Sequence, residues 1–217
     1  MMQSPVIDLR RLDDVPGAGI GLKRLGEPAQ ERALRFTSAK DREEFVAGRV
    51  ALQHFAASLL DVDPARLVPD YHCPQCGPGQ NHGRPGFLLD GGPAPLALSA
   101  SRASGWLLLA GVVRPAEGLR LGVDLEVVSR VGFDGFDDVA LTAAEKEFLV
   151  SIPVQDRAMQ RARLWARKEA WLKMTGEGLR RNPAELDVLD LPGLRDVTGI
   201  HENGKLPEGL VAALAVG

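Results

Sequence analysis

The sequence predicts a mixed α and β protein built from two similar halves, and three observations predict it. Segments with helical periodicity alternate along the chain with short apolar runs of strand length. A shift of 119 residues places DPARL at 63–67 over NPAEL at 182–186. Each half also contains an apolar run of strand length late in its sequence, GWLLLAGVV from Gly105 and GLVAALAVG from Gly209. We therefore expect an α+β fold of two α/β halves, with the active site in the cleft between them.

Composition excludes several classes of protein. The 217 residues are 45% hydrophobic and 25% charged, which excludes a disordered chain. A formal net charge of -3 provides no overall basic field for nucleic acid. Two cysteines cannot build a disulfide framework, and there is neither a signal-peptide core nor an apolar run of membrane length. We expect a cytoplasmic protein that does not bind membranes.

The N-terminal half is predicted to contain one long helix and two strands. Residues 48–60 (GRVALQHFAASLL) have the amphipathic pattern of a helix, and residues 69–95 form a loop rich in proline, glycine and cysteine. The apolar runs 96–99 and 106–113 are short enough for strands.

The turn-like segment RPAEG at 114–118 marks the joint between the halves. The expected domains are therefore residues 1–116 and residues 117–217. The shift that aligns the two turns also places the helix 48–60 over residues 167–179.

The C-terminal half is predicted to contain a strand and two helices. LRLGVDLEV at 119–127 alternates with the period of two that is typical of a strand. Thr142, with Glu145 at the capping-box position, predicts the start of a short helix. Residues 156–174 form the longest helical stretch, and two glycines end it.

Three carboxylates in this half form a candidate site. Asp124 and Glu126 share one face of the strand, for which the default interpretation is a solvated strand edge. Glu169 falls in the apolar stripe of the helix 156–174, where a carboxylate must be neutralised, paired or bound to a cation. Lys173, one turn later, is one possible partner. The three carboxylates also suit a hard divalent cation such as Mg²⁺, so the pattern leaves both interpretations open.

These residues resemble a known signature. GVDLE at 122–126, followed about forty residues later by WARKEAWLK at 165–173, is similar to the two-part motif of 4′-phosphopantetheinyl transferases. The likeness is to the larger, surfactin-synthetase-activating (Sfp-like) type. Gly48-Arg49, HGRP at 82–85 and LSAS at 98–101 extend it over most of the chain.

The resemblance implies a fold, an activity and partners. The fold would be a pseudo-dimer of two α+β halves, and the chain would be monomeric. The activity would be that of a holo-carrier-protein synthase, which transfers 4′-phosphopantetheine from coenzyme A to a serine of an apo acyl or peptidyl carrier protein. Mg²⁺ would be the metal, with Mn²⁺ able to replace it. Neither the carrier nor its pathway is indicated, although the composition fits secondary metabolism.

The resemblance also implies roles for single residues. Asp124, Glu126 and Glu169 would ligate the metal, and Glu169 would act as general base for the carrier serine. Lys173 would stabilise the phosphates and the leaving group. Lys168 is a second cofactor-binding candidate, although helical geometry points it away from Glu169. This set suits phosphoryl transfer, which needs positioning, charge neutralisation and a proton acceptor.

Further contacts to coenzyme A are expected in the N-terminal half. Guanidinium groups grip phosphate in bidentate fashion, and the candidates are Arg32, Arg35, Arg42, Arg49 and Arg84. Arg49 and Arg84 lie in motif-like segments, whereas Arg32 and Arg35 read more readily as surface charges. Ser99 and Ser101 are expected cofactor neighbours, or else plain strand-edge hydroxyls. Ala100 stands where relatives carry a histidine that contacts the nucleotide, and Arg102 is a possible substitute.

One cluster falls outside the resemblance. His72, Cys73, Cys76 and His82 crowd into one short loop that leads to Arg84. A C-x-x-C pair with two histidines has the residue types of a zinc site, but a second well-spaced pair is missing. The favoured interpretation is a turn with two thiols, with zinc as the alternative.

Two other functions remain open on the sequence. One is a catalytically weakened binding or regulatory protein on the same fold, which Ala100 motivates. The other is an unrelated Mg²⁺-dependent phosphohydrolase, because three carboxylates and a lysine fit that chemistry too. No P-loop, nucleophile elbow or G-x-G-x-x-G motif is present.

Overall fold

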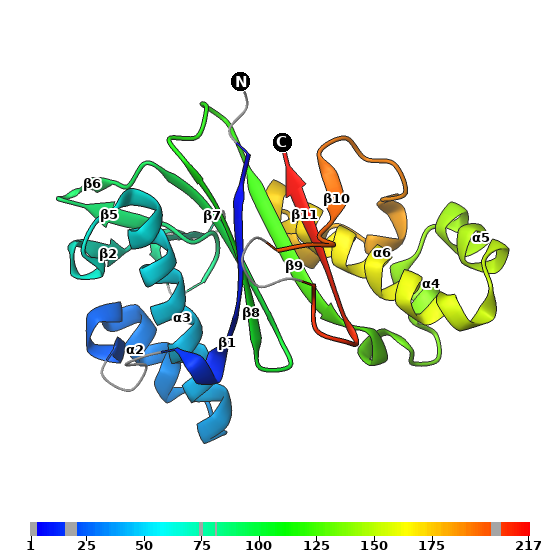
Figure 1. The fold of residues 1–217 in the computed structure, drawn as a ribbon, viewed down its shortest axis with the longest axis horizontal. Helices are drawn as coiled ribbons and strands as arrows, with labels where there is room; N and C mark the ends of the chain where they lie inside the picture. Colours follow the sequence, from blue (N-terminus) through cyan, green and yellow to red (C-terminus); the bar gives the residue numbers. More distant parts are fainter. Residues whose placement is uncertain (1–3, 16–20, 74–75, 81, 201–204) are drawn as a thin grey trace. The chain divides into compact units, whose positions relative to one another are not determined.

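The chain folds into two compact units, shown in the ribbon of a computed structural model in Figure 1. The structure describes residues 4–15, 21–73, 76–80, 82–200 and 205–217. Unit 1 consists of Met1–Ala100 and Gly105–Leu119, and unit 2 of Ser101–Ser104 and Arg120–Gly217. The main division thus follows residue 119, close to the expected joint, but the short segment Ser101–Ser104 joins the second unit.

Unit 1 combines a long helix with several small sheets. Its elements are β1 (Val6–Arg11), α2 (Glu27–Leu34), α3 (Ala39–Leu60), β2 (Leu67–Pro69), β3 (Tyr71–Cys73), β4 (Gly77–Gln80), β5 (Phe87–Leu89), β6 (Gly92–Pro93), β7 (Leu96–Ala103, the end of which belongs to unit 2) and β8 (Trp106–Val113). The sheets have the orders β1-β8-β7, β2-β5-β6 and β3-β4. Helix α3 packs against β8, and the core between them includes Phe55, Leu98 and Leu109.

The predicted elements of unit 1 are present, and some are longer than expected. Helix α3 covers the expected residues 48–60 but begins at Ala39, because Ser38 caps it by accepting a hydrogen bond from the Asp41 N–H at 3.3 Å. The apolar run at 106–113 is β8, whereas the run at 96–99 continues to Ala103. The expected loop holds β3 to β6.

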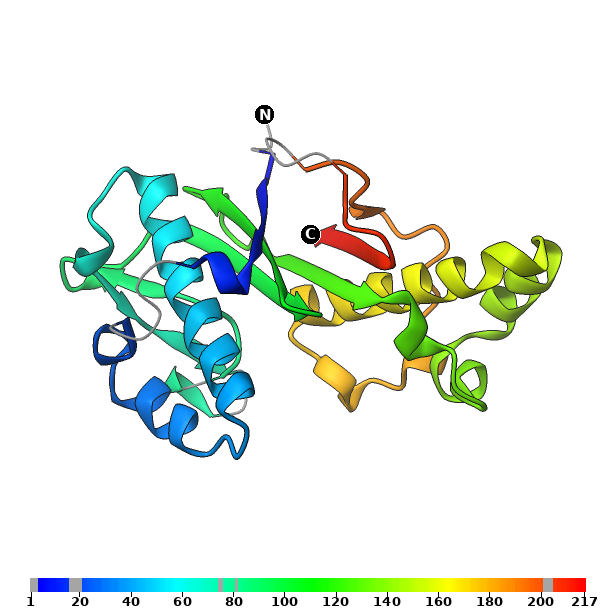
Figure 2. The ribbon, with the colours of Figure 1, turned by 60° about the horizontal axis from the view of Figure 1, so that its bottom comes forward.

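Unit 2 is a three-stranded sheet with its longest helix packed against it. Its elements are β9 (Leu121–Val127), α4 (Phe136–Ala140), α5 (Ala143–Ser151), α6 (Val154–Thr175), β10 (Leu194–Asp196) and β11 (Leu210–Val216). The antiparallel order is β10-β11-β9, and Asp124 pairs with Ala213. Figures 1 and 2 show α6 running along β9 and β11. The predicted capping box is confirmed, since Thr142 and Glu145 exchange both hydrogen bonds.

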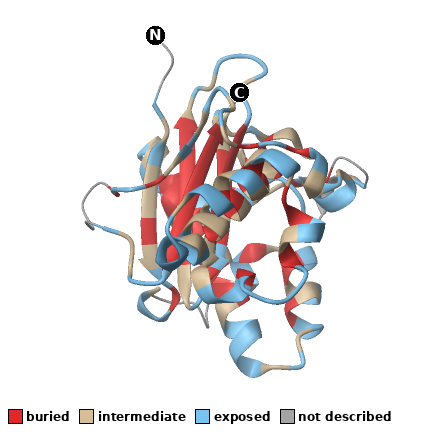
Figure 3. Cartoon of the chain, turned by 90° about the vertical axis from the view of Figure 1, so that its right-hand side faces the viewer, coloured by how far each residue is buried: buried red, intermediate tan, exposed pale blue. Residues whose placement is uncertain are grey.

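Both faces of the unit 2 sheet are buried, the face against α6 and the opposite face that carries the apolar side chains of β9. Figure 3 shows buried residues concentrated along strands and on the inward sides of helices. Leu121, Val123 and Leu125 are buried on the apolar face predicted for β9, and Leu172 is buried on α6. The predicted mixture of α and β structure is confirmed. Within the described residues, no helix has the length and apolar content needed to cross a bilayer.

The two turns that the internal shift aligned have the same local structure. Asp63 Oδ1 accepts a hydrogen bond from Ala65 N at 2.8 Å, and Asn182 Oδ1 accepts one from Ala184 N at 3.1 Å. Each turn follows a helix of 22 residues. The alignment fails at the helix end, because α6 stops at Gly176, whose φ is +77°. A glycine adopts that left-handed backbone at low cost, so residues 176–179 leave the helix that the shift extended to them.

Candidate functional site

The polar face of β9 lies against α6 because Gly122 has no side chain. A Cβ atom at Gly122 would overlap the carbonyl oxygen of Ala170 and lie 2.6 Å from the backbone nitrogen of Met174. Both neighbours are backbone atoms of α6, which cannot move aside as a flexible side chain can. The glycine therefore lets α6 approach β9 closely at residue 122. Asp124 is the next residue along the strand whose side chain lies on the same face.

Asp124 is the centre of a polar network at this contact. Its side chain lies on β9 and the residue is only 5% exposed, so the solvated strand edge considered from the sequence is wrong. Lys173 Nζ on α6 lies 2.7 Å from Asp124 Oδ1. Ser101 Oγ donates to the same oxygen at 2.8 Å and lies 3.0 Å from Lys173 Nζ. Three side chains from three segments of unit 2 thus hold one another in position.

Lys173 takes a different partner from the one expected. Its ammonium pairs with Asp124 across the helix–strand contact, and no salt bridge joins it to Glu169 among the described residues. The positive charge of Lys173 acts on Glu169 from a distance and lowers the pKa of Glu169. The simple i,i+4 pair within α6 is therefore not what neutralises Glu169.

Glu126 and Glu169 are half-buried carboxylates close to Asp124. Burial is the main cause that raises the pKa of Glu169, and the negative charges of Asp124 and Glu126 raise it further. Burial also raises the pKa of Glu126, opposed by its hydrogen bond from the Val127 N–H. The charge of Asp124 raises the pKa of both Glu126 and Glu169, so the three carboxylates lie near one another.

The donor atoms suit a hard divalent cation in their chemistry, although their present spacing does not bring all three carboxylates to one point. Asp124 Oδ2 is buried and accepts no hydrogen bond from the described part of the chain. An anionic oxygen in that position is costly unless something binds it. Carboxylate oxygens are the ligands that Mg²⁺ prefers. The three carboxylates do not gather their oxygens within 4.8 Å of one another in the described residues, and Lys173 supplies the counter-charge to Asp124.

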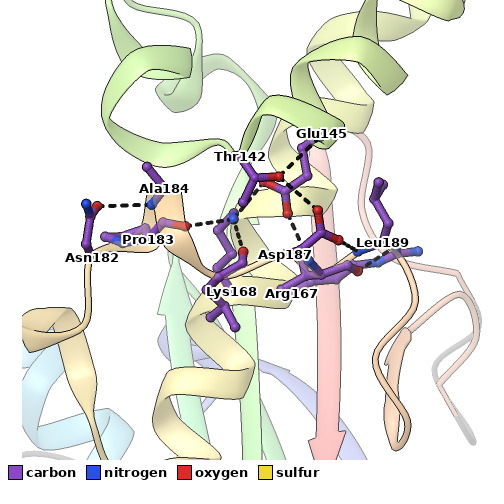
Figure 4. Close-up of polar contacts among 11 residues, drawn as sticks. Thr142, Glu145, Arg167, Lys168, Asn182, Pro183, Ala184, Asp187 and Leu189 are labelled. Atoms are coloured by element: carbon purple, nitrogen blue, oxygen red, sulfur yellow. Dashed lines mark hydrogen bonds and ion pairs between the residues drawn. The ribbon is translucent and has the colours of Figure 1, made fainter.

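Lys168 on α6 lies among polar contacts with Glu145 and the segment around Pro183, as Figure 4 shows. Its Nζ is 2.7 Å from Glu145 Oε2 and 2.9 Å from Pro183 O, and it also donates to Leu186 O. Both charged side chains are fully buried, and burial lowers the pKa of Lys168 while Glu145 opposes the shift. An ammonium enclosed in this way ties α6 to α5 and the 183–186 loop, which differs from the cofactor contact expected from the sequence.

Glu145 makes contacts beyond the helix cap that its motif predicted. Besides closing the capping box at Thr142, its carboxylate accepts from the Val188 N–H at 2.9 Å and pairs with Lys168. The capping box was readable from the sequence. The link to Lys168 was not, because it joins residues 23 positions apart in two helices.

Two of the expected anion contacts in unit 1, Arg32 and Arg49, lie near each other. Arg49 on α3 stacks on Tyr71, with its guanidinium carbon 3.6 Å from the ring centroid. Arg32 lies 5.6 Å from the Phe45 ring, and burial, then the charge of Arg49, lowers its pKa. These two guanidiniums therefore lie close enough to repel, an arrangement that an anion would relieve.

The remaining candidates are placed as follows. Arg84 is exposed on the segment that pairs with β3, and Arg35 and Arg42 are exposed as well. Ser99 is buried on β7 within unit 1. Ser101, two residues on, is buried against Asp124 in unit 2, which makes it a positioning group for the carboxylate. Only its place on a strand was visible in the sequence.

Phosphoryl-transfer enzymes typically combine carboxylates with a lysine. Here one of three carboxylates is buried and has an oxygen with no hydrogen-bond partner in the described part of the chain. The comparisons with known proteins agree with that class. Residues 120–208 match the family model of the 4′-phosphopantetheinyl transferase superfamily, and this range includes Asp124, Glu126, Glu169 and Lys173.

Two curated relatives extend the similarity. The chain is 28% identical over 195 residues to 4′-phosphopantetheinyl transferase 1 of Fusarium mangiferae, covering 79% of this chain and 63% of that protein. It is 27% identical over 151 residues to 4′-phosphopantetheinyl transferase HetI of Nostoc sp. (strain PCC 7120), covering 69% and 59%. The matched regions thus span about six tenths of these relatives, and the chain is similar to 4′-phosphopantetheinyl transferases.

Proposed function

We propose that this protein transfers the 4′-phosphopantetheine group of coenzyme A to a serine of an apo acyl or peptidyl carrier protein. One observation carries the proposal: Asp124, within the range that matches the superfamily, has one buried oxygen with no hydrogen-bond partner among the described residues, while Lys173 and Ser101 hold the other oxygen. A carboxylate held rigidly with one oxygen open is suited to bind a cation that accompanies a pyrophosphate.

The residues divide the work as follows. The carrier serine oxygen forms a bond to the phosphorus nearest the pantetheine, and the bond from that phosphorus to the bridging oxygen of the adenosine 3′,5′-bisphosphate leaving group breaks. Glu169 accepts the serine proton. Lys173 balances the negative charge that develops on the leaving phosphate. Asp124, Glu126 and Glu169 would hold Mg²⁺, which supplies neutralisation of the pyrophosphate charge when bound.

Coenzyme A contacts are proposed in unit 1 at Arg49 and Arg84, with Ser99 and Ser101 as further neighbours of the cofactor. The two halves would form a pseudo-dimer with the site in the cleft between them, as in the Sfp-like type that the sequence resembles. The protein would act in the cytoplasm.

The test is the mass of apo carrier proteins after incubation with this protein, coenzyme A and Mg²⁺. We expect a mass increase equal to one phosphopantetheine group. Glu169→Gln keeps the side-chain volume but removes a base and a ligand charge, and it should lower the rate about 10²- to 10⁴-fold with little change in melting temperature. Glu147→Gln, an exposed glutamate on α5, is the matched control.

Each other outcome identifies a different function. Hydrolysis of coenzyme A without any carrier would indicate the phosphohydrolase. Binding of carrier or coenzyme A without transfer would indicate the regulatory protein that Ala100 motivates. A folded Glu169→Gln variant with the wild-type rate would remove Glu169 from the site.

A further inference from the structure

Unit 1 contains a second cluster of ligating side chains that the proposed transfer does not use. The ligand atoms of Cys73, Cys76 and His82 all lie within 4.8 Å of one another. Cys73 is the last residue of β3, Cys76 follows three positions later, and neither cysteine is in a disulfide. The cluster is within unit 1 and shares no residue with the carboxylate group around Asp124.

The backbone pairing of β3 and its neighbours brings these three side chains close together. Strands β3 and β4 are antiparallel, and Cys73 pairs with Gly77, so the chain reverses around Cys76. Gly77 has a φ of +83° and open space at its Cβ position, so the turn needs glycine for its conformation. Cys76 therefore immediately precedes the residue of β4 that pairs with Cys73.

A second glycine brings His82 to the same place. Gly83 has a φ of +94°, and a Cβ atom there would lie 2.8 Å from the Cα of Cys73. The next residue, Arg84, exchanges two backbone hydrogen bonds with His72, at 3.0 and 2.8 Å. Strand β3 thus pairs with β4 along one edge and with the segment containing Arg84 along the other. His82 lies on that second segment, beside Cys73.

We propose that Cys73, Cys76 and His82 bind a zinc ion that clips this hairpin to the returning segment. Two thiolates and an imidazole are ligands that Zn²⁺ prefers, in contrast to the carboxylates that suit Mg²⁺. Zn–S bonds of about 2.3 Å and Zn–N bonds of about 2.0–2.1 Å, at tetrahedral angles, place sulfur and nitrogen ligands about 3.6 Å apart. The distance from Cys76 Sγ to His82 Nε2 is 3.7 Å.

No fourth His, Cys, Asp or Glu joins this group in the part of the chain that the structure describes, so the proposal assigns the fourth zinc position to a water molecule. The chain has two cysteines and four histidines, and residues 77–81 between the ligands are glycine, proline, glutamine and asparagine. His72 neighbours Cys73 but is exposed where Cys73 is buried, because successive side chains of a strand point to opposite faces. His72 is therefore excluded as a ligand, which makes it a matched control.

The experiment measures metal content of the full chain, purified under reducing conditions without chelator and with any affinity tag removed. Elemental analysis should give one zinc per chain. Cys76→Ser and His82→Asn should each lose the zinc, whereas His72→Asn should retain it. Replacement of zinc by Co²⁺ should give the visible bands of a tetrahedral site and an absorption from thiolate-to-cobalt charge transfer, and both should disappear in Cys76→Ser.

Cys76 is exposed and His82 half-buried, so circular dichroism of the variants should match the wild type. A wild-type chain that holds no zinc and gives no cobalt thiolate spectrum overturns the proposal and leaves the cluster as a turn with two thiols. Equal zinc in the wild type and Cys76→Ser overturns it as well, by marking the metal as adventitious. Because metal content and spectra are read without any transfer assay, this result is independent of the proposed function.

Discussion

Replacing Lys168 with methionine tests whether this lysine is structural. Methionine keeps a long apolar stem but removes the ammonium, leaving the fully buried Glu145 without its cation and the carbonyls of Pro183 and Leu186 without a donor. Removing one partner of a buried ion pair costs about 3–5 kcal/mol, because the other charge stays in the interior uncompensated. We expect the free energy of unfolding of unit 2 to fall by that amount.

The assay is urea unfolding followed by tryptophan fluorescence, since Trp165 and Trp171 both lie on α6. Adding Glu145→Gln to Lys168→Met should cost less than Glu145→Gln does in the wild type, with a coupling energy of about 1–3 kcal/mol. Lys146→Met, which removes the exposed pair with Asp138 at 2.8 Å, is the control and should change stability little.

The opposite pattern would refute this reasoning. If Lys168→Met unfolds at the wild-type urea concentration but no longer binds coenzyme A, the lysine is a cofactor contact and its burial is incidental. If the variant is destabilised and its folded fraction binds coenzyme A normally, the structural role stands.

Three further predictions follow from the site and the packing. Transfer should stop in excess chelator and return with Mg²⁺ or Mn²⁺, and transfer that persists in chelator would exclude the carboxylates as metal ligands. Sedimentation at micromolar concentration should give the mass of one chain, because the resemblance implies that the two halves already make the pair that single-half relatives need two copies to make. Gly122→Ala should lower the free energy of unfolding by about 1–3 kcal/mol, since its Cβ meets the backbone of α6, whereas Gly199→Ala, with open space around it, should not.

Local patterns predicted the elements of this protein well, because the signals are themselves local. The capping box of α5 and the two aligned turns at Asp63 and Asn182 depend on hydrogen bonds that span two or three residues. The N-terminal start of α3 was missed although Ser38 is a standard cap, because few apolar positions follow it in residues 39–44.

Long-range packing was harder to predict. The alternation in β9 identified its two faces, but the polar face with Asp124 and Glu126 was interpreted by default as exposed to solvent. Only the structure shows that α6 covers it at Gly122. The helical spacing likewise predicted that Lys173 could pair with Glu169. In the structure Lys173 pairs with Asp124 on β9, the strand that α6 covers. In both cases the missing information was the partner element, which no periodicity contains.

Lys168 and Lys173 show how the surroundings of a charge separate a structural role from a functional one. They are five residues apart on α6, and each pairs with a carboxylate at 2.7 Å. Lys168 is fully enclosed, and all its acceptors belong to the protein, so nothing there remains for a ligand to satisfy. The side chain of Lys173 is 33% exposed, and its partner Asp124 has one buried oxygen that accepts no hydrogen bond from any residue the structure describes. A polar group left incomplete in this way is costly to the fold, and binding a cation would remove that cost. The candidate site is therefore placed on the Lys173 side of the helix.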